Sequence, residues 1–514
     1  MNGAESLVRT LVVNGVDVCF TNPGTSEMHF VAALDKVEGM RCVLGMFEGV
    51  VTGAADGYYR MSGKPACTLL HLGPGLGNGL ANLHNAKKAR SGIVNIVGEH
   101  ATYHLKHDAP LTSDIEGVAR PMSNWIRTAA TSQSLAGDCA AAIREARRAP
   151  GHIATLVAPA DTAWGDAAGI VEAEPPPPRA KVDPSAVRDA ARALSGDGAT
   201  LMLGGAALRG KALALAGRIA AKTGCRLLSE YNNARAEGGA GRVRVDRLPY
   251  PIDQALDKLK DTRALVLAGA KSPVSFFAYP GKPSVLVPES CAVTRLAGVE
   301  EDLEHALEAL ADVLGATRVE PAHVNALARP ALPSGAVTPE GIAAVLAALL
   351  PENAIVADES VTNGRNLGPV MAGAAPHDWL NICGGSIGWA LPVATGAAIA
   401  APDRKVVALE GDGSGMYTLQ ALWTMARENL DVTVVVLANR AYQILRGELK
   451  AMGAGTPGQR ATDMLTLDRP DLDWIALARG LGVEGSRAAD LDAFAVQLKQ
   501  ALAQRAPRLI ELVL

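Results

Sequence analysis

Short apolar runs rich in β-branched residues alternate along most of the chain with longer segments of helical periodicity. Alternation of this kind predicts parallel sheets covered by helices. The first group of strand-like runs is VDVCFT, CVLGMFE, ACTLLHL, GIVNIVGE and HIATLVAP. A second group, closer to the middle of the chain, is LMLGG, CRLLSE, ALVLAG and SVLVP. We therefore predict an α/β protein built from doubly wound parallel sheets.

Two proline-rich segments divide this pattern into three domains. EAEPPPPRAKVDP, residues 172–184, contains four consecutive prolines and is typical of a stiff, extended linker. EPAHVNALARPALPSGAVTPEG, residues 320–341, is rich in Pro and Ala and forms a second linker. At 514 residues the chain is long enough for about three domains. The predicted domains span residues 1–170, 185–318 and 338–514.

The third domain contains the most informative segment, KVVALEGDGSGMYTLQALWTMARENLDVTVVVLAN, residues 405–439. It predicts a strand, an amphipathic helix and a second strand that is almost wholly apolar, as in a parallel strand buried on both faces. Asp412 and Asn439 each follow a strand at its carboxyl end, where open α/β sheets bind ligands. An isolated GDG is often only a turn. Together with Asn439, it favours Mg²⁺ bridging a diphosphate, since one carboxylate and one amide oxygen suit that ion.

Composition and charge exclude several other classes of protein. The 49 basic and 53 acidic residues give a formal charge of −4 and are dispersed, so a nucleic-acid partner is not expected. No apolar stretch is long enough to suggest a membrane span, and the amphipathic start MNGAESLVRTLV does not resemble a secretory signal. We expect a cytoplasmic protein. The cysteines form no CxxC pair for zinc or redox chemistry and are Cys19, Cys42, Cys67, Cys139, Cys225, Cys291 and Cys383.

The first domain offers three candidate polar segments. Glu48 stands between an apolar run and a helix, where a glutamate is most often a first-turn residue. HLGPGLGNG, which begins at His71, is a glycine-rich turn that does not fit the dinucleotide fingerprint, and a strand-end His commonly bonds only the backbone. A polar loop contains His100, His104 and His107. Metal binding by these three is conceivable, but a solvated surface is the commoner fate, and we assign them no catalytic role.

GDG followed by Asn439 after one βαβ unit resembles the metal and diphosphate motif of thiamine-diphosphate-dependent enzymes, in the branch that holds acetolactate synthase and benzoylformate decarboxylase. The resemblance implies that Asp412, Asn439 and the carbonyl of Ala441 hold Mg²⁺. Family members usually have two adjacent Asn residues here, whereas this chain has Ala438 before Asn439. The second Asn is the usual ligand, so this departure leaves the ligand set intact.

The same resemblance assigns roles in the reaction. FEGVVTGAADGYYR matches the family signature around its catalytic glutamate, which implies that Glu48 bonds a ring nitrogen of the aminopyrimidine. His71 takes the place of a catalytic histidine of the benzoylformate decarboxylase type. Gly385 and Ile387 correspond to the carbonyl acceptor and the wedge that bend the cofactor, although Ile387 is equally typical of core packing. Further cofactor contacts are implied for Thr25, Gly411, Gly413, Ser414 and Tyr442.

The implied domains are pyrimidine-binding, central and diphosphate-binding. In this family the pyrimidine domain of one subunit meets the diphosphate domain of another, so a homodimer or homotetramer is expected. The implied chemistry is decarboxylation of a 2-oxoacid. We expect carboligation to follow, because the benzoylformate decarboxylase type uses a central-domain histidine to protonate the intermediate, whereas the corresponding loop here, KSPVSFFAYPG at residues 271–281, offers no His.

Three alternatives stay open. His71 is a possible proton donor, so the first alternative is a 2-oxoacid decarboxylase that performs no ligation. A second is a catalytically silent regulatory paralogue, which the joint presence of Glu48, Asp412 and Asn439 disfavours. A third, a nicotinamide or flavin oxidoreductase, is disfavoured by the absent fingerprint.

Overall fold

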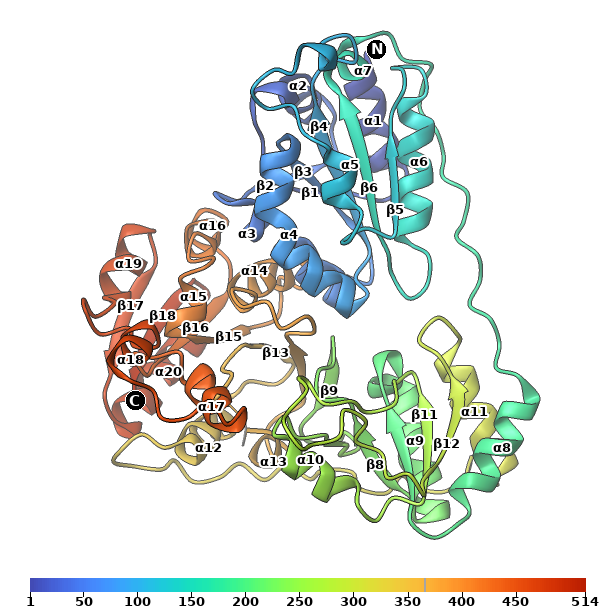
Figure 1. The fold of residues 1–514 in the computed structure, drawn as a ribbon, viewed down its shortest axis with the longest axis vertical. Helices are drawn as coiled ribbons and strands as arrows, with labels where there is room; N and C mark the ends of the chain where they lie inside the picture. The colour runs from blue at the N-terminus through green and yellow to red at the C-terminus, as the bar shows by residue number, and fades with distance from the viewer. Residues whose placement is uncertain (365–366) are drawn as a thin grey trace.

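The computed structural model describes residues 1–364 and 367–514 and contains three α/β units, each built around its own sheet (Figure 1). The predicted fold class is confirmed. Of the described residues, no helix combines the length and apolar character needed to cross a membrane.

The first unit is a six-stranded sheet in the order β2-β1-β3-β4-β6-β5, with every neighbouring pair parallel. Helices cover both faces: one face packs against α1, α2 and α6, the other against α3, α4 and α5. The strands are β1 (Val18–Asn22), β2 (Arg41–Leu44), β3 (Ala66–Leu70), β4 (Ile93–Glu99), β5 (Trp125–Thr128) and β6 (Ile153–Pro159). The helices are α1 (Gly3–Val13), η1 (Thr25–Glu27), α2 (Met28–Lys36), α3 (Glu48–Ser62), α4 (Leu72–Ala89), η2 (Leu105–His107), α5 (Ile115–Ala119), α6 (Leu135–Ala146) and α7 (Ala160–Trp164).

The central unit is a five-stranded parallel sheet in the order β10-β8-β7-β11-β12. One strand prediction is wrong: SVLVP, residues 284–288, forms only an isolated bridge from Val285 to Val274, and the edge strand is β12. SVLVP is apolar but is bounded by prolines, which remove backbone donors from a ladder. The strands are β7 (Ala199–Leu203), β8 (Arg226–Ser229), β10 (Asp246–Arg247), β11 (Ala264–Ala268) and β12 (Ala292–Ala297), and the helices α8 (Pro184–Leu194), η3 (Gly205–Leu208), α9 (Gly210–Thr223), α10 (Ile252–Leu259) and α11 (Leu303–Val313).

The third unit is a seven-stranded sheet in the order β17-β18-β16-β15-β13-β14-β9. Six strands are parallel, and β9 (Ala236–Gly238), which comes from the central segment of the chain, pairs antiparallel with β14. The parallel strands are β13 (Ala354–Asp358), β14 (His377–Asn381), β15 (Val406–Gly411), β16 (Val432–Ala438), β17 (Glu484–Ala488) and β18 (Arg508–Val513). The helices are α12 (Pro339–Leu349), α13 (Leu367–Met371), α14 (Ala390–Ala400), α15 (Asp412–Gly415), α16 (Ala421–Arg427), α17 (Gln443–Ala451), α18 (Gln459–Met464), α19 (Trp474–Gly480) and α20 (Leu491–Ala503).

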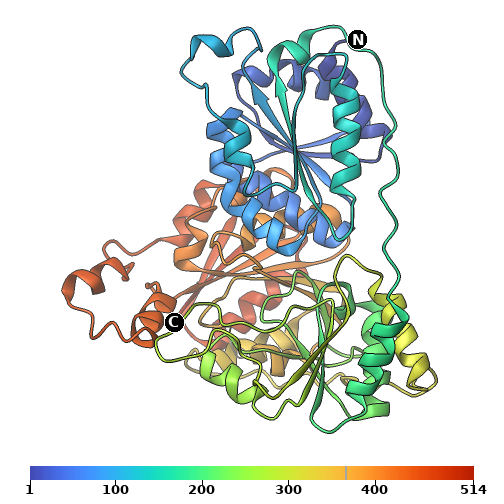
Figure 2. The same cartoon turned by 45° about the vertical axis from the view of Figure 1, so that its right-hand side comes forward.

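The proline-rich segment at residues 172–183 has almost no secondary structure and runs as an extended connection from the first unit down to the central one (Figure 2). Four consecutive prolines prevent helix formation there, since each ring removes a backbone donor. This connection lets the first unit lie against the third, although the third comes last in the sequence (Figures 1 and 2).

The first and third units meet where α3 crosses α14. A Cβ added at Gly396 would lie 1.8 Å from the carbonyl oxygen of Ala54, and one at Gly57 would lie 2.1 Å from that of Val393. Glycine at these positions therefore allows the two helix backbones to touch. A single hydrophobic cluster runs through this contact and contains side chains from both units.

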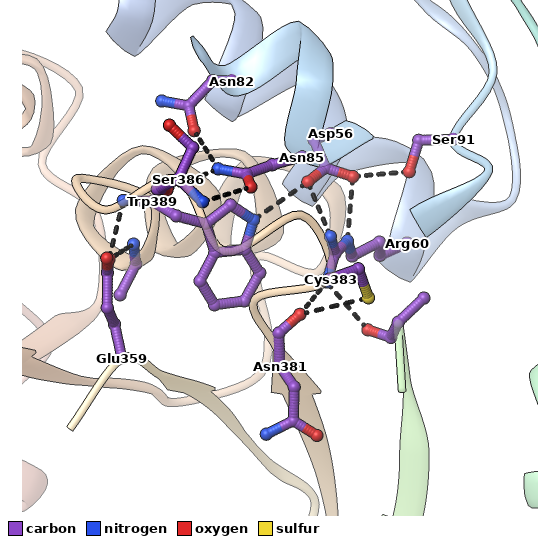
Figure 3. Close-up of polar contacts among 12 residues, drawn as sticks. Asp56, Arg60, Asn82, Asn85, Ser91, Glu359, Asn381, Cys383, Ser386 and Trp389 are labelled. Atoms are coloured by element: carbon purple, nitrogen blue, oxygen red, sulfur yellow. Dashed lines mark hydrogen bonds and ion pairs between the residues drawn. The ribbon is translucent and has the colours of Figure 1, made fainter. Parts of the chain in front are cut away.

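A buried ion pair lies beside this crossing (Figure 3). Arg60 donates to both oxygens of Asp56 at 2.8 Å, and the exposed fractions of the two side chains are 1% and 0%. The Arg60 guanidinium also donates to the carbonyl oxygens of Asn381 and Ala234, at 2.7 and 3.1 Å. Trp389 donates its indole N–H to Asp56 at 3.0 Å. Every charge in the pair thus has several partners, as a buried pair requires.

We predict that Asp56→Asn lowers the free energy of unfolding by about 3–5 kcal/mol, because it leaves the Arg60 guanidinium buried without a counter-charge. Urea denaturation followed by circular dichroism measures this loss. Arg41→Ala, which removes the exposed pair with Glu428 in the same interface, serves as the control and should cost less than about 1 kcal/mol. Equal losses in the two variants would contradict the assignment.

Candidate active site

The carboxyl edge of the third sheet brings Asp412 and Asn439 side by side. They directly follow β15 and β16, which are adjacent and parallel. Asp412 is 4% exposed; its Oδ1 accepts from the Gly413 amide at 3.0 Å and its Oδ2 from the Arg440 amide at 2.6 Å. Asn439 Oδ1 accepts from the Ala441 amide at 3.0 Å. Main-chain amides therefore fix both oxygen-bearing groups.

This edge has the chemistry of a hard-cation site. It offers one carboxylate and one amide oxygen, and Mg²⁺ takes its remaining ligands from main-chain carbonyls, water and phosphate. Burial raises the pKa of Asp412, which a nearby cation would offset. Within the described residues no three His, Cys, Asp or Glu side chains form a group that could hold a metal ion. The carboxylate of Asp412 and the amide oxygen of Asn439 fit the chemistry of the expected ion.

The turn after β15 is shaped by close contacts. A Cβ at Gly413 would lie 2.6 Å from the ring of Tyr442, so glycine is needed where Tyr442 covers the turn. Ser414 donates its hydroxyl to Glu410, and its Oγ lies 3.2 Å from the Gly411 carbonyl. The Ser414 hydroxyl is thus engaged within the turn.

Two buried carboxyl groups, neither of them predicted from the sequence, lie next to this edge. Glu359 accepts from the amides of Gly388, Trp389 and Ala390 at 2.7–2.8 Å and so caps the start of α14. Burial raises the pKa of Glu359 to about 7. Burial and then the proximity of Glu359 raise the pKa of Glu410 well above its usual range. The signals available were an acidic residue just after β13 and another directly before GDG.

The loop before α14 carries Gly385 and Ile387. Gly385 has a φ of +75° and Gly388 a φ of +86°, both in the left-handed region that favours glycine. A Cβ at Gly385 would lie 2.9 Å from Phe276 of the central unit. Ile387 is half-buried, and it is absent from the hydrophobic clusters formed by the described residues. The loop therefore holds Ile387 at a partly exposed position.

In the first unit, Glu48 is the first residue of α3 and is 7% exposed. Its Oε2 accepts from Asn78 Nδ2 at 3.0 Å. A Cβ at Gly75 would come within 3.2 Å of both Glu48 Oε1 and His71 Cβ, so the glycine-rich turn makes room between them. Nothing in the local sequence pattern links Asn78 to Glu48, so this contact was not predicted.

His71 pairs with Glu27, which was not among the site residues predicted from the sequence. Its Nδ1 lies 2.8 Å from Glu27 Oε2, and Glu27 is 4% exposed. Glu27 also accepts from the Gly24 amide at 2.8 Å and from the Ser26 hydroxyl at 2.7 Å. The ring therefore turns Nδ1 to the carboxylate and leaves Nε2 for another partner. Thr25 opens the same turn and is exposed.

His100, His104 and His107 form a row beyond β4. Their ring centroids are 5.5 and 5.6 Å apart. His104 and His107 are exposed, in agreement with the commoner fate of such a loop.

Helix α4 contacts both Glu48 and the loop before α14 within one chain. Asn78 holds Glu48, whereas Asn85 donates to the Ser386 carbonyl at 2.7 Å and His84 lies 3.1 Å from that of Gly384. Seven residues along an α-helix correspond to about 10 Å. The carboxylate and residues 384–386 of one chain are thus held at different levels of α4.

Two family models match the outer units. The model described as "Thiamine pyrophosphate enzyme, N-terminal TPP binding domain" matches residues 1–118, and the corresponding "C-terminal TPP binding domain" matches residues 367–512. "Putative acetolactate synthase large subunit IlvX" of Mycobacterium tuberculosis is 52% identical over 100% of this chain and 99% of its own length. The chain belongs to the thiamine pyrophosphate enzyme family. Thiamine pyrophosphate and thiamine diphosphate are the same cofactor.

Further thiamine pyrophosphate enzymes resemble the whole chain. Benzoylformate decarboxylase of Pseudomonas aeruginosa is 30% identical over 97% of this chain and 96% of its own length. The solved structure of a thiamine diphosphate-dependent 4-hydroxybenzoylformate decarboxylase from Rhodococcus jostii RHA1 shares the fold, with a TM-score of 0.84, 24% identity and coverage of 99% and 98%. The protein is therefore an enzyme of the acetolactate synthase and benzoylformate decarboxylase type, as the sequence motifs indicated.

Proposed function

We propose that the protein catalyses the thiamine-diphosphate- and Mg²⁺-dependent decarboxylation of a 2-oxoacid, followed by carboligation to a second carbonyl compound. The observation that carries this proposal is the placement of Asp412 and Asn439 on adjacent strand ends. The presence of Glu48 at the start of α3 supports the proposal further.

The third unit would hold the metal and the diphosphate. Asp412, Asn439 and the Ala441 carbonyl supply oxygen ligands to Mg²⁺. Main-chain groups of Gly411, Gly413 and Ser414 and the ring of Tyr442 would contact the diphosphate. When bound, thiamine diphosphate supplies the electron sink that permits loss of CO₂.

The first unit would handle the proton. Glu48, held by Asn78, would share its proton with the pyrimidine ring, and its burial would exclude water that competes for this bond. Ile387 and the Gly385 carbonyl would fix the bend of the cofactor, and Thr25 would contact it from the first unit.

Two chains would complete each site. Within one chain, Asn78 of α4 holds Glu48, whereas Asn85, about two turns further along the same helix, holds the Ser386 carbonyl. We infer a homodimer or homotetramer in which Glu48 of one chain meets Gly385 of another. A two-fold axis would create two equivalent sites.

Carboligation is supported by the surroundings of Gly385. Phe276, on the central-unit loop at residues 271–281, is the side chain that approaches Gly385, and it offers no proton. A relative described as an acetolactate synthase subunit matches the full length of this chain.

Simple decarboxylation is a second candidate, favoured by one specific observation. Glu27 holds His71 at 2.8 Å with Nε2 free to face a ligand, which suits a proton donor. On this reading the product would be an aldehyde.

We predict that Asp412→Ala weakens the binding of thiamine diphosphate with Mg²⁺ by at least about 100-fold, since it removes the anionic metal ligand. Calorimetric titration measures this affinity. Asp403→Ala, in the same unit with a side chain that is 93% exposed, is the control. Retained affinity in Asp412→Ala would refute the metal assignment.

Glu48→Gln is expected to keep cofactor affinity but to slow hydrogen–deuterium exchange at the thiazolium carbon by about 100-fold, because the amide cannot share a proton. Nuclear magnetic resonance of the bound cofactor reports the exchange rate. Glu38→Gln, at an exposed site, should match the wild type. Exchange as fast as in the wild type would make Glu48 a bystander.

Product analysis tests the fate of the acyl group. Incubation with pyruvate, cofactor and Mg²⁺ should yield acetolactate, and His71→Ala should raise the ratio of acetolactate to acetaldehyde. Free acetaldehyde without acetolactate would establish the second candidate instead. Absence of turnover with pyruvate would point to a different acyl donor.

A further inference from the structure

Helix α17 follows the proposed metal ligands directly but has little apolar burial to hold it. It begins four residues after Asn439, and none of its residues is buried. Tyr442, the residue before it, covers Gly413. A helix with so little buried surface depends on specific polar contacts to stay in one place.

Glu448 provides such contacts to the central unit. Its Oε1 accepts from the Tyr250 hydroxyl at 2.8 Å and its Oε2 from the Tyr279 hydroxyl at 3.0 Å, so each carboxylate oxygen has its own phenol. Burial raises the pKa of Tyr250, and Glu448 raises it further, so this phenol remains a donor at neutral pH. Hydrogen bonds to a charged acceptor are among the stronger ones in proteins.

One of the two tyrosines, Tyr279, is packed into the central unit. Tyr279 is 8% exposed and belongs to a hydrophobic cluster with Leu248, Leu259 and Leu286 of the central unit. Met452, at the end of α17, packs against the same cluster. The contacts of Glu448 therefore join α17 to a packed part of another unit.

The aromatic contacts continue to the loop before α14. The ring centroids of Tyr250 and Phe276 are 5.3 Å apart, and those of Phe276 and Phe277 are 4.8 Å apart. Phe276 also lies against Gly385. The central unit thus contacts both segments that the proposed function places around the cofactor.

Leu445 lies on the same face of α17 as Glu448, one turn closer to Tyr442. Its side chain is 46% exposed, and the exposed fractions of Phe276 and Phe277 are 44% and 46%. Leu445 on α17 and Phe276 and Phe277 on the central-unit loop thus all expose apolar surface.

We propose that Glu448 is a positioning residue: by binding Tyr250 and Tyr279 it holds α17 so that Leu445 and Phe276 together receive the side chain of the acyl donor. This inference rests on the proposed function. An apolar face of this kind binds donors with an apolar side chain larger than methyl, because each added buried methylene group stabilises the complex.

The test compares Glu448→Ala, Glu448→Gln and the wild type, with Lys450→Ala as a control at an exposed position on the same helix. In the protein without cofactor, amide hydrogen exchange of residues 443–451 should quicken by about tenfold in Glu448→Ala, as expected for the loss of hydrogen bonds to a charged group. Glu448→Gln keeps one acceptor oxygen and should restore much of the protection. Lys450→Ala should exchange like the wild type.

Steady-state kinetics supply the second readout. In Glu448→Ala the KM for 4-methyl-2-oxopentanoate should rise about tenfold while kcat changes little, and the KM for pyruvate should rise less. Phe276→Ala should reduce the preference for the larger donor in the same way. A general loss of stability would lower the activity toward both donors equally.

Unchanged hydrogen exchange and unchanged KM values in Glu448→Ala would overturn the proposal, as would an equal loss for both donors. Should Glu448→Ala fail to fold, the double variant Tyr250→Phe/Tyr279→Phe removes both donors without removing the rings, and the same outcomes apply. A wild-type protein that binds no thiamine diphosphate would refute the proposed function, whereas the exchange measurement would still decide whether Glu448 anchors α17.

Discussion

The arrangement of the three units depends on the guanidinium of Arg60. It binds the carboxylate of Asp56 in the first unit, the Asn381 carbonyl in the third and the Ala234 carbonyl from the central segment. Taking a charge out of water is costly, so such a group adopts the one position in which all its donors are satisfied. This requirement fixes three segments that are far apart in the sequence around one side chain (Figure 3). The close backbone contact of α3 with α14 then holds the first and third units together.

This arrangement separates scaffold from chemistry. The residues with proposed roles lie at the carboxyl edges of two sheets, whereas the helices that pack the units together carry mainly glycine, alanine and valine. Because α4 spans the junction, its asparagines set where Glu48 and the loop before α14 stand. Packing between the units therefore sets the geometry of the proposed site. A substitution in this packing, far from any ligand, would alter the positions of the site residues.

Local sequence pattern predicted the parts that depend on neighbours in the chain. The strands around GDG were recoverable, and adjacency of β15 and β16 followed from their being one βαβ unit. Pairings across long distances were not recoverable: His71 with Glu27 and Glu48 with Asn78 join residues 44 and 30 positions apart, and neither partner stands out by its type. SVLVP misled because apolar character alone does not place a segment in a sheet. β9 was missed because three residues of mixed polarity carry no periodicity.

The pairing of β9 with β14 has a consequence for how the protein can be cut or rebuilt. β9 comes from the middle of the chain yet covers the edge of the third sheet. A truncated chain without the middle segment would leave the backbone groups of β14 unpaired, which is a template for association with other exposed edges. The middle segment therefore cannot be exchanged as an independent domain. Any fusion or domain exchange that replaces it must also supply a strand to pair with β14.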